Sequence, residues 1–390
     1  MKTIKNNFQT MARRVFNKRF ARWGMDLALV PLIFLLFLIR YIFKIKFFRV
    51  HGGRIGHLAM NNELFLRRQQ LGLIREKKIK YVGIAPTSVC NKQLVTMLKR
   101  KLKIVQFPQP RLVRTMTKFM AEQSLLSKWD MFVTLPYDVG YFPQFNEVGS
   151  SLSFTELEEE QGWELLKRMN VDNWFVCVHV RDSVYVDGLL KRGDSRYTYR
   201  NSNIENYLKA IKYIAGQGGY VVRMGAKVKE KLDLRNPKII DYATLYRTEF
   251  GDIYLPARAK FFLGTGSGIA SIAEIFNTPV ILTNVIPLNP LIPSAPIAHF
   301  PPGKRDLFIP KKIWSNKKKR FLTFKEMLEF ELHHFSFESE DYGKEQLHPI
   351  ENTSEEILDV ATEMNQRLEG TWITTEGEEV LQNQFKSLFK

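Results

Sequence analysis

Residues 264–268 read Gly-Thr-Gly-Ser-Gly, between an apolar run that ends at Leu263 and a helical pattern that begins near Ile269. Glycine lets the backbone approach a ligand closely, and free N–H groups at a helix start attract anions. A strand, a glycine–serine loop and a helix in this order can hold a phosphate or a diphosphate. A tight turn whose glycines serve only packing would give the same pattern. The candidate phosphate-binding residues are Gly264, Thr265, Gly266, Ser267 and Gly268.

Cationic side chains are expected at the ends of two further strands. His179 and Arg181 follow one apolar run, and in an extended chain they point to the same side. Arg223 follows another apolar run. Ligands of doubly wound sheets bind beyond the carboxyl ends of the strands, and arginine can pair with a phosphate through two hydrogen bonds. The sequence therefore predicts that all three bind a diphosphate, unless Arg181 forms a salt bridge with Asp182 or Asp187.

A second glycine-rich loop, residues 52–57, follows a predicted strand at 47–51. If two domains face each other, this loop would face the phosphate site across the cleft between them. His57 or Glu63 would then act as base or charge stabiliser for an incoming hydroxyl. A lone histidine in such a loop often has only a structural hydrogen bond, which is the alternative for His57. The residues expected on this acceptor side are Gly53, Arg54, Gly56 and Asn61.

Two acidic residues are weaker candidates, Asp241 and Glu274. Glu274 lies seven residues after Ser267 on the same predicted helix, where it would accept from a ribose hydroxyl or face solvent. The chain contains no Asp-x-Asp motif, which removes one common way of holding a metal-bound nucleotide diphosphate. We therefore expect no metal and no bound cofactor.

The order of apolar runs predicts the fold class. The chain has 390 residues, 45% of them apolar, which is enough for two α/β domains. Strand-like runs alternate with helical patterns, so we expect parallel, doubly wound sheets with helices on both faces. Thr155 and Glu158 predict a capping box for a helix that ends near Met169. The expected division is a membrane anchor at 1–46, α/β domains at 47–150 and 151–350 with a linker at 142–153, and a helical tail at 351–390.

The N-terminal segment is strongly basic. Residues 1–55 hold twelve Lys and Arg against one acid, Asp26, out of a net charge of +18 for the whole chain. Residues 27–39 are apolar and interrupted only by Pro31. This pattern favours an interfacial or re-entrant helix on the cytoplasmic face of a membrane. It does not favour a basic domain that binds nucleic acid. A borderline membrane span and a buried core helix are the alternatives.

The two cysteines, Cys90 and Cys177, are far apart and neither shares a metal-type spacing with a histidine. Their positions favour a protein of a reducing compartment that contains neither a disulfide nor a structural zinc.

Four motifs in a fixed order give the chain a family resemblance. They are RIGHL at 54–58, HVRD at 179–182, YRN-x₂-IE-x-Y at 199–207 and FFLGTGSG at 261–268. In these motifs the chain resembles a largely uncharacterised family of bacterial glycosyltransferases, over roughly residues 47–300. It is more distantly similar to the GT-B fucosyltransferases, which pair a glycine-rich loop with an HxR strand end and a late serine-rich phosphate loop.

The resemblance implies two Rossmann-like domains that face each other across a cleft and a reaction without a metal. By this resemblance, Arg181 would hold the donor diphosphate and stabilise the departing nucleotide. Ser267 and its loop would hold the same phosphates, and residues 53–57 would border donor and acceptor. The GTGSG loop departs from the serine-rich run of the fucosyltransferases, which leaves the donor base and sugar open.

The resulting expectation is a membrane-associated glycosyltransferase that moves a sugar from a nucleotide-sugar donor to a glycan or glycolipid acceptor. Its expected place is the cytoplasmic face of a bacterial inner membrane, in surface-polysaccharide assembly, with no nucleic-acid partner. A nucleotide-sugar epimerase or hydrolase is one alternative. A non-catalytic membrane protein that binds sugar nucleotides is another.

Overall fold

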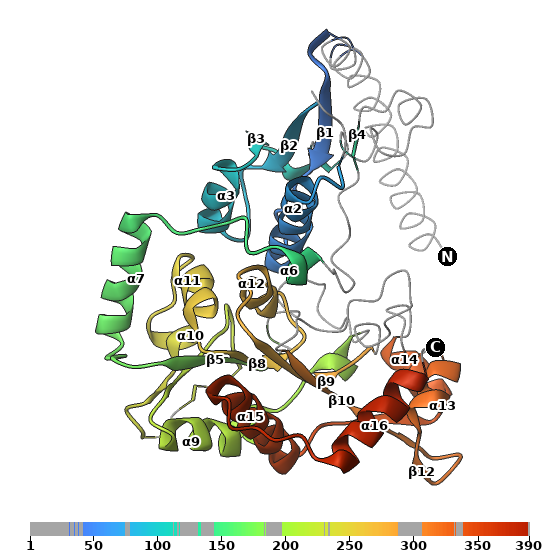
Figure 1. The fold of residues 1–390 in the computed structure, drawn as a ribbon. Coiled ribbons are helices and arrows are strands. Elements are labelled where there is room, and N and C mark those ends of the chain that lie inside the picture. The colour runs from blue at the N-terminus through green and yellow to red at the C-terminus, as the bar shows by residue number, and fades with distance from the viewer. Residues whose placement is uncertain are drawn as a thin grey trace, which may run out of the picture. The chain divides into compact units, whose positions relative to one another are not determined.

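The computed structural model describes residues 31, 35, 38, 42–74, 79–111, 113, 114, 117, 132, 133, 144–182, 184, 197–229, 231, 232, 235–287, 306–330, 332 and 338–388. The chain divides into two compact units (Figure 1). The first comprises Met1–Gly53, Ile74–Cys90 and Leu98–Leu135, and the second comprises Arg54–Leu73, Asn91–Met97 and Pro136–Lys390.

The predicted anchor at 1–46 lies almost entirely outside the described residues. Within the described part of the chain, no helix has the length and apolar character needed to cross a membrane.

The first unit contains a four-stranded parallel sheet in the order β3-β2-β1-β4. Its strands are β1 (Ile45–Arg49), β2 (Lys80–Pro86), β3 (Lys103–Phe107) and β4 (Phe132–Val133). The ring of Phe48 is fully buried, and a Cβ at Gly83 would lie 2.9 Å from it. The strand β1 lies within two residues of the strand predicted at 47–51.

The second unit is built on a six-stranded parallel sheet in the order β10-β9-β8-β5-β6-β7. The strands are β5 (Phe175–His179), β6 (Tyr220–Arg223), β7 (Ile239–Ile240), β8 (Phe262–Thr265), β9 (Val280–Val285) and β10 (Leu307–Pro310). The chain moves outward from β5 to β7, then returns to place β8 on the other side of β5. This is the strand order of the dinucleotide-binding Rossmann sheet, whose ligands bind where the order reverses. The reversal lies between β5 and β8.

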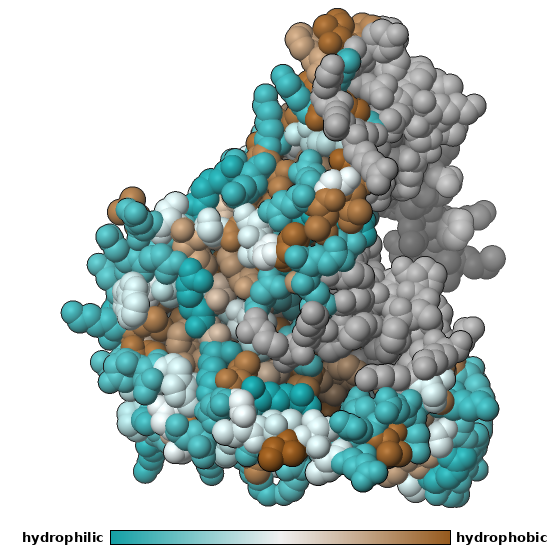
Figure 2. Space-filling view, in the orientation of Figure 1, coloured by the Kyte–Doolittle hydropathy of each residue, from teal (hydrophilic) through white to brown (hydrophobic). Residues whose placement is uncertain are grey.

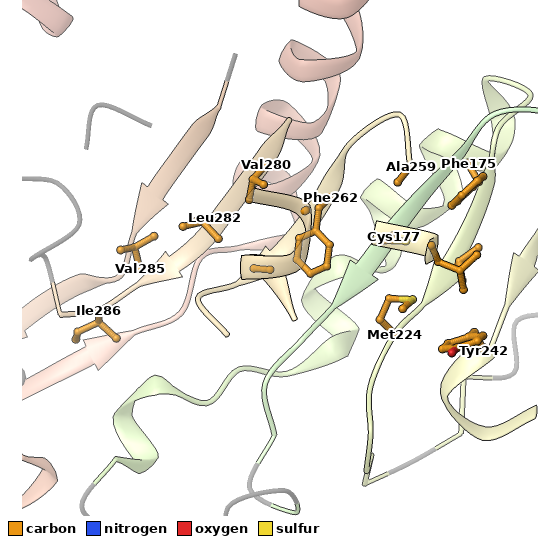
Figure 3. Close-up of a cluster of buried hydrophobic side chains, with 14 of the residues drawn as sticks. Phe175, Cys177, Met224, Tyr242, Ala259, Phe262, Val280, Leu282, Val285 and Ile286 are labelled. Atoms are coloured by element: carbon orange, nitrogen blue, oxygen red, sulfur yellow. The ribbon is translucent and has the colours of Figure 1, made fainter. Parts of the chain in front are cut away.

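Helices cover both faces of this sheet, as the sequence predicts (Figure 1). On one face, α9 (Leu208–Gly216) and α15 (Ser354–Glu369) pack on Val176, Val178 and Leu263. On the other face lie α7 (Glu156–Arg168), α10 (Tyr242–Leu245), α11 (Gly251–Arg258) and α12 (Ala270–Ile275). Figure 3 shows this second core, to which β5 contributes Phe175 and Cys177. Alternate residues of one strand therefore enter opposite cores, each large apolar side chain contributing about 1.5–3 kcal/mol.

Local signals fix several helix ends of the second unit. The helices α7, α13 (Phe324–Glu329) and α15 each begin with a threonine capping box, at Thr155, Thr323 and Thr353. The box at Thr155 confirms the predicted helix start. α15 ends at Gly370, whose φ of 74° is left-handed and suits glycine.

The remaining elements of the second unit are peripheral. They include a three-stranded antiparallel sheet of β11 (Lys312–Ser315), β12 (Arg320–Phe321) and β13 (Leu347–Ile350), with α14 (Ser339–Lys344) and α16 (Glu376–Ser387). In the basic run at 317–320, Lys317 pairs with Glu345, and Lys318 and Arg320 pair with Glu326. The face in Figure 2 is mostly hydrophilic, broken by separate hydrophobic patches.

The helix α2 (Ile55–Gln70) belongs to the second unit, although the predicted division placed it in a domain at 47–150. It packs on α12, and its last turn is hydrogen-bonded to residues of that unit. Sequence position alone does not show this, because the helix follows directly after a strand of the first unit.

Candidate anion-binding site

The ends of β5 and β8 meet where the strand order reverses. His179 and Gly264 are register partners, and a Cβ at Gly264 would lie 2.0 Å from the His179 carbonyl oxygen. Beyond the strands, the backbone N–H of Arg181 donates to Thr265 Oγ1 at 2.9 Å. The structure therefore brings Arg181 and the loop at 264–268 together, as the sequence predicts.

The glycines of this loop have different surroundings. A Cβ at Gly268 would lie 3.0 Å from the backbone nitrogen of Gly56, so the start of α2 approaches the loop closely. A Cβ at Gly266 would have no neighbouring atom within 4 Å. The Ser267 Oγ is buried and has no hydrogen-bond partner in the part of the chain that the structure describes. Packing thus explains Gly264 and Gly268, whereas Gly266 and Ser267 leave a ligand room and a polar atom to bind.

Arg200 is a further residue of the site. It ends the short 3₁₀ helix η1 (Thr198–Arg200), and its Nη2 donates to the Gly266 carbonyl at 3.2 Å. Sequence reasoning gave Arg200 no role, because no predicted strand ends in front of it. The signal that points to it is its place in the YRN motif, one of the four motifs that carry the family resemblance.

Three guanidinium groups gather beside the loop, from Arg54, Arg181 and Arg200. Burial lowers the pKa of Arg181 to about 10, and the nearby cations Arg200 and Arg54 contribute to the decrease. The pKa of Arg200 is lowered by burial and by Arg54, with Tyr199 acting in the opposite direction. Guanidinium groups gathered in this way repel one another and favour a bound anion.

The guanidinium of Arg181 has no hydrogen-bond or ion-pair partner among the described residues. The carboxylate of Asp182 instead accepts from the backbone N–H groups of Val184 at 3.1 Å and Lys229 at 2.8 Å. The alternative salt bridge with Asp182 is therefore not formed, and Asp187 lies outside the described residues. With respect to the described residues, both edges of the Arg181 guanidinium are available for a ligand.

The start of α2 adds to the positive potential. Its N-cap residue, Arg54, makes no side-chain cap hydrogen bond, and its first turn contains no acid. The N-terminal end of a helix carries a partial positive charge, so a cation there is unfavourable and an anion is favourable. Because Gly56 lies against Gly268, this uncapped end adjoins the glycine–serine loop.

His179 is neutral at physiological pH. Burial, followed by the cations Arg223 and Arg181, lowers its pKa to about 4. Its Nδ1 is buried and finds no hydrogen-bond partner among the described residues. A neutral imidazole at the end of β5 can donate or accept one hydrogen bond.

Arg223 has a carboxylate partner. Its Nη1 donates to Asp241 Oδ1 at 2.9 Å, and both residues are buried. Asp241 follows β7, the neighbour of β6, so the two side chains meet at one sheet edge. The structure thus places the predicted phosphate ligand Arg223 in an ion pair instead, and it gives Asp241 a structural role.

Glu63 also departs from its predicted role. It is fully buried on α2, paired with Arg67 at 2.8 Å, and it accepts from the backbone N–H of Ser151 at 2.7 Å. A carboxylate held in this way is poorly placed to take a proton from an acceptor hydroxyl.

The other predicted residues are spread more widely. Asn61 is 1% exposed on α2, whereas His57 and Glu274 are half-buried. Gly53 belongs to the first unit and Arg54 to the second. The acceptor side of the prediction thus divides between the two units, and Arg54 joins the arginine cluster. Among the described residues, no group of three or more His, Cys, Asp or Glu could hold a metal ion.

Neither protein-family models nor curated proteins give a match to this chain. Solved structures that resemble it include several glycosyltransferases and a UDP-GlcNAc 2-epimerase from Methanocaldococcus jannaschii. One is the ADP-heptose lipopolysaccharide heptosyltransferase II of E. coli, with a TM-score of 0.43 and 11% identity, covering 68% of this chain and 90% of that one. A family 9 glycosyl transferase from Veillonella parvula gives a TM-score of 0.40 and 9% identity, covering 68% and 85%.

A third is TibC from enterotoxigenic E. coli, described as an iron-containing dodecameric glycosyltransferase. It gives a TM-score of 0.37 and 10% identity, covering 89% of this chain and 77% of that one. At such low TM-scores and identities, the likeness establishes neither the activity nor the donor of this chain.

Proposed function

We propose that the protein is a glycosyltransferase that uses a nucleotide-sugar donor and binds the donor's diphosphate where the Rossmann-type sheet reverses. One observation carries the proposal. Arg54, Arg181 and Arg200 converge on a glycine–serine loop at that place, and Arg181 has no partner among the described residues. Rossmann-type sheets bind diphosphates at this position, and arginine is well suited to pair with phosphate oxygens.

The proposed chemistry follows from the charge of the leaving group. When the bond between the anomeric carbon and the phosphate oxygen breaks, the departing nucleoside diphosphate gains one negative charge. Fixed cations and N–H groups stabilise that charge more strongly than they stabilise the intact donor, which lowers the barrier. Arg181, Arg200 and the loop would contact the phosphate oxygens, and Ser267 Oγ would donate to one of them.

The proposed reaction needs no metal. The three arginines supply the positive charge that a divalent cation supplies in other sugar transferases. The sequence supports the proposal, since it lacks an Asp-x-Asp motif that would hold a metal-bound diphosphate.

A thermal-shift screen with UDP, GDP, ADP and CDP tests the donor site. We expect at least one nucleoside diphosphate to raise Tm, with the increase unchanged by EDTA, and the matching nucleotide sugar to be consumed when an acceptor is added. An increase that disappears with EDTA would refute the metal-free mechanism. No increase with any of the four would refute the diphosphate site.

We further propose that residues 1–46 hold the enzyme at the cytoplasmic face of a membrane, where a lipid-linked or glycan acceptor would be available. The support is the basic and apolar composition of this segment. The full chain should float with vesicles that contain phosphatidylglycerol. Binding should fall at least about tenfold when five cations are replaced by glutamine, because each contributes about 1 kcal/mol near an anionic surface: Arg13, Arg14, Lys18, Arg19 and Arg22. Equal flotation of both chains would contradict the electrostatic attachment.

A further inference from the structure

Arg67 lies in the last turn of α2 and is fully buried. A guanidinium has five N–H donors, and in Arg67 each has an acceptor. Its acceptors are Glu63 Oε1 at 2.8 Å, the carbonyls of Phe145 at 3.2 Å, Val148 at 2.9 Å and Ile275 at 2.6 Å, and Asn277 Oδ1 at 2.8 Å. Burying a charge is costly unless it is paired, so the full set of acceptors around the Arg67 guanidinium favours one arrangement of the segments that supply them.

These acceptors come from three segments of the second unit. Glu63 is on α2, Phe145 and Val148 belong to α6 (Gln144–Glu147) and the residue after it, and Ile275 is the last residue of α12. Carbonyls at a helix C-terminus carry a partial negative charge that favours a cation. Arg67 therefore joins α2, the predicted linker and the end of α12.

The helices α2 and α12 run parallel. At their starts Gly56 lies against Gly268, and at their ends Arg67 is bonded to Ile275. Parallel neighbours place their positive ends together and their negative ends together, which is electrostatically unfavourable. A cation at the shared negative end offsets this, and Arg67 is that cation. An anion beside the start of α2 would offset it from the other end.

We propose that Arg67 is a positioning residue for the diphosphate site, an inference that rests on the proposed function. It lies thirteen residues from Arg54 along the helix, about 20 Å away at 1.5 Å per residue, and does not touch the ligand. By fixing α2 against α12 it keeps Arg54 and the uncapped N–H groups of α2 beside the glycine–serine loop. Loosening this contact moves the start of α2 and weakens anion binding at a distance.

Calorimetric titration of the full chain with inorganic pyrophosphate tests this inference. Arg67→Lys keeps the charge but loses two donors and the planar geometry, and we expect affinity to fall at least about fivefold. Asn277→Gly removes the Oδ1 acceptor of Arg67 and the Nδ2 donor to the Phe145 carbonyl, and glycine suits the φ of 58° at this position. A smaller loss of about twofold to threefold is expected. The control is Ile357→Ala, a buried position on α15 in the core on the opposite face of the sheet from α12, which should lower Tm and leave pyrophosphate affinity unchanged.

A double variant separates positioning from general destabilisation. If Arg67 acts through the start of α2, the loss caused by Arg67→Lys should shrink in an Arg54→Ala background, since the positioned cation is then absent. A lower Tm with unchanged pyrophosphate affinity would overturn the inference, and so would additive losses. If Arg67→Lys does not fold, the pyrophosphate affinity and the Tm of Asn277→Gly, alone and in the Arg54→Ala background, test the inference in the same way.

The test also distinguishes the inference from the function on which it rests. Pyrophosphate binding that depends on Arg181 but not on Arg67 or Asn277 would overturn only the positioning role. A wild-type chain that does not bind pyrophosphate would overturn the proposed diphosphate site, and the positioning role with it.

Discussion

Replacement of Arg181 by alanine should weaken the binding of inorganic pyrophosphate and nucleoside diphosphates by about 100-fold. Its guanidinium has no other partner among the described residues, so the substitution removes ligand contacts and breaks no described ion pair. Hydrogen bonds to charged groups contribute about 1.5–3 kcal/mol each, and a bidentate pair lost from a partly buried site corresponds to about 100-fold. Titration calorimetry in low salt measures the change directly.

Two further variants make the Arg181 result specific. Arg181→Lys keeps the charge but cannot form the bidentate hydrogen bonds of a guanidinium, so its affinity should be about tenfold below that of the wild type. Arg320→Ala removes an exposed arginine of β12 that pairs with Glu326, and affinity should not change. Equal affinities of Arg181→Ala and the wild type would show that the diphosphate is bound elsewhere. A similar loss in Arg320→Ala would mean that binding reflects only the overall charge.

Sequence patterns predicted the parts of the fold that depend on neighbouring residues. The alternation of apolar runs and helical patterns predicted parallel sheets with helices on both faces, and Thr155 with Glu158 located the start of α7. No apolar run predicted the edge strand β10. The meeting of Arg181 with the loop at 264–268 was also predictable. Both follow strands of one parallel sheet, whose carboxyl ends lie at one edge.

Sequence patterns could not show which charges pair over long distances. Arg223 and Asp241 are eighteen residues apart and meet only because β6 and β7 are adjacent. Arg200 reaches the loop through a carbonyl sixty-six residues away, and no periodicity marks such a contact. The contacts that join α2 to the second unit include those of Arg67, whose acceptors lie up to 210 residues along the chain. A charged residue in a helical pattern is more often solvent-exposed than buried, so the pattern favoured an exposed Arg67.

Replacement of Gly264 by alanine is expected to lower the free energy of unfolding by about 3 kcal/mol or more. The new Cβ would lie 2.0 Å from the His179 carbonyl oxygen and 3.0 Å from its carbonyl carbon, so β5 and β8 would have to separate. Excess volume in a packed core typically costs about 1–3 kcal/mol, and a backbone neighbour that cannot rotate away raises that cost. Urea denaturation monitored by circular dichroism checks it. Wild-type stability would mean that the two strands are not paired at this position.

Gly266, two residues later, should show the opposite behaviour. A Cβ there would meet no protein atom within 4 Å, so Gly266→Ala should leave the free energy of unfolding within about 0.5 kcal/mol of the wild type. Pyrophosphate affinity should nevertheless fall about tenfold, because the methyl group would occupy the space in which a phosphate approaches the loop backbone. Gly216→Ala is the matched control, since a Cβ at Gly216 also has no neighbour within 4 Å and lies on α9. Unchanged affinity in Gly266→Ala would assign the glycines of this loop to packing alone, whereas a loss of binding without a loss of stability would identify the loop as a ligand cradle.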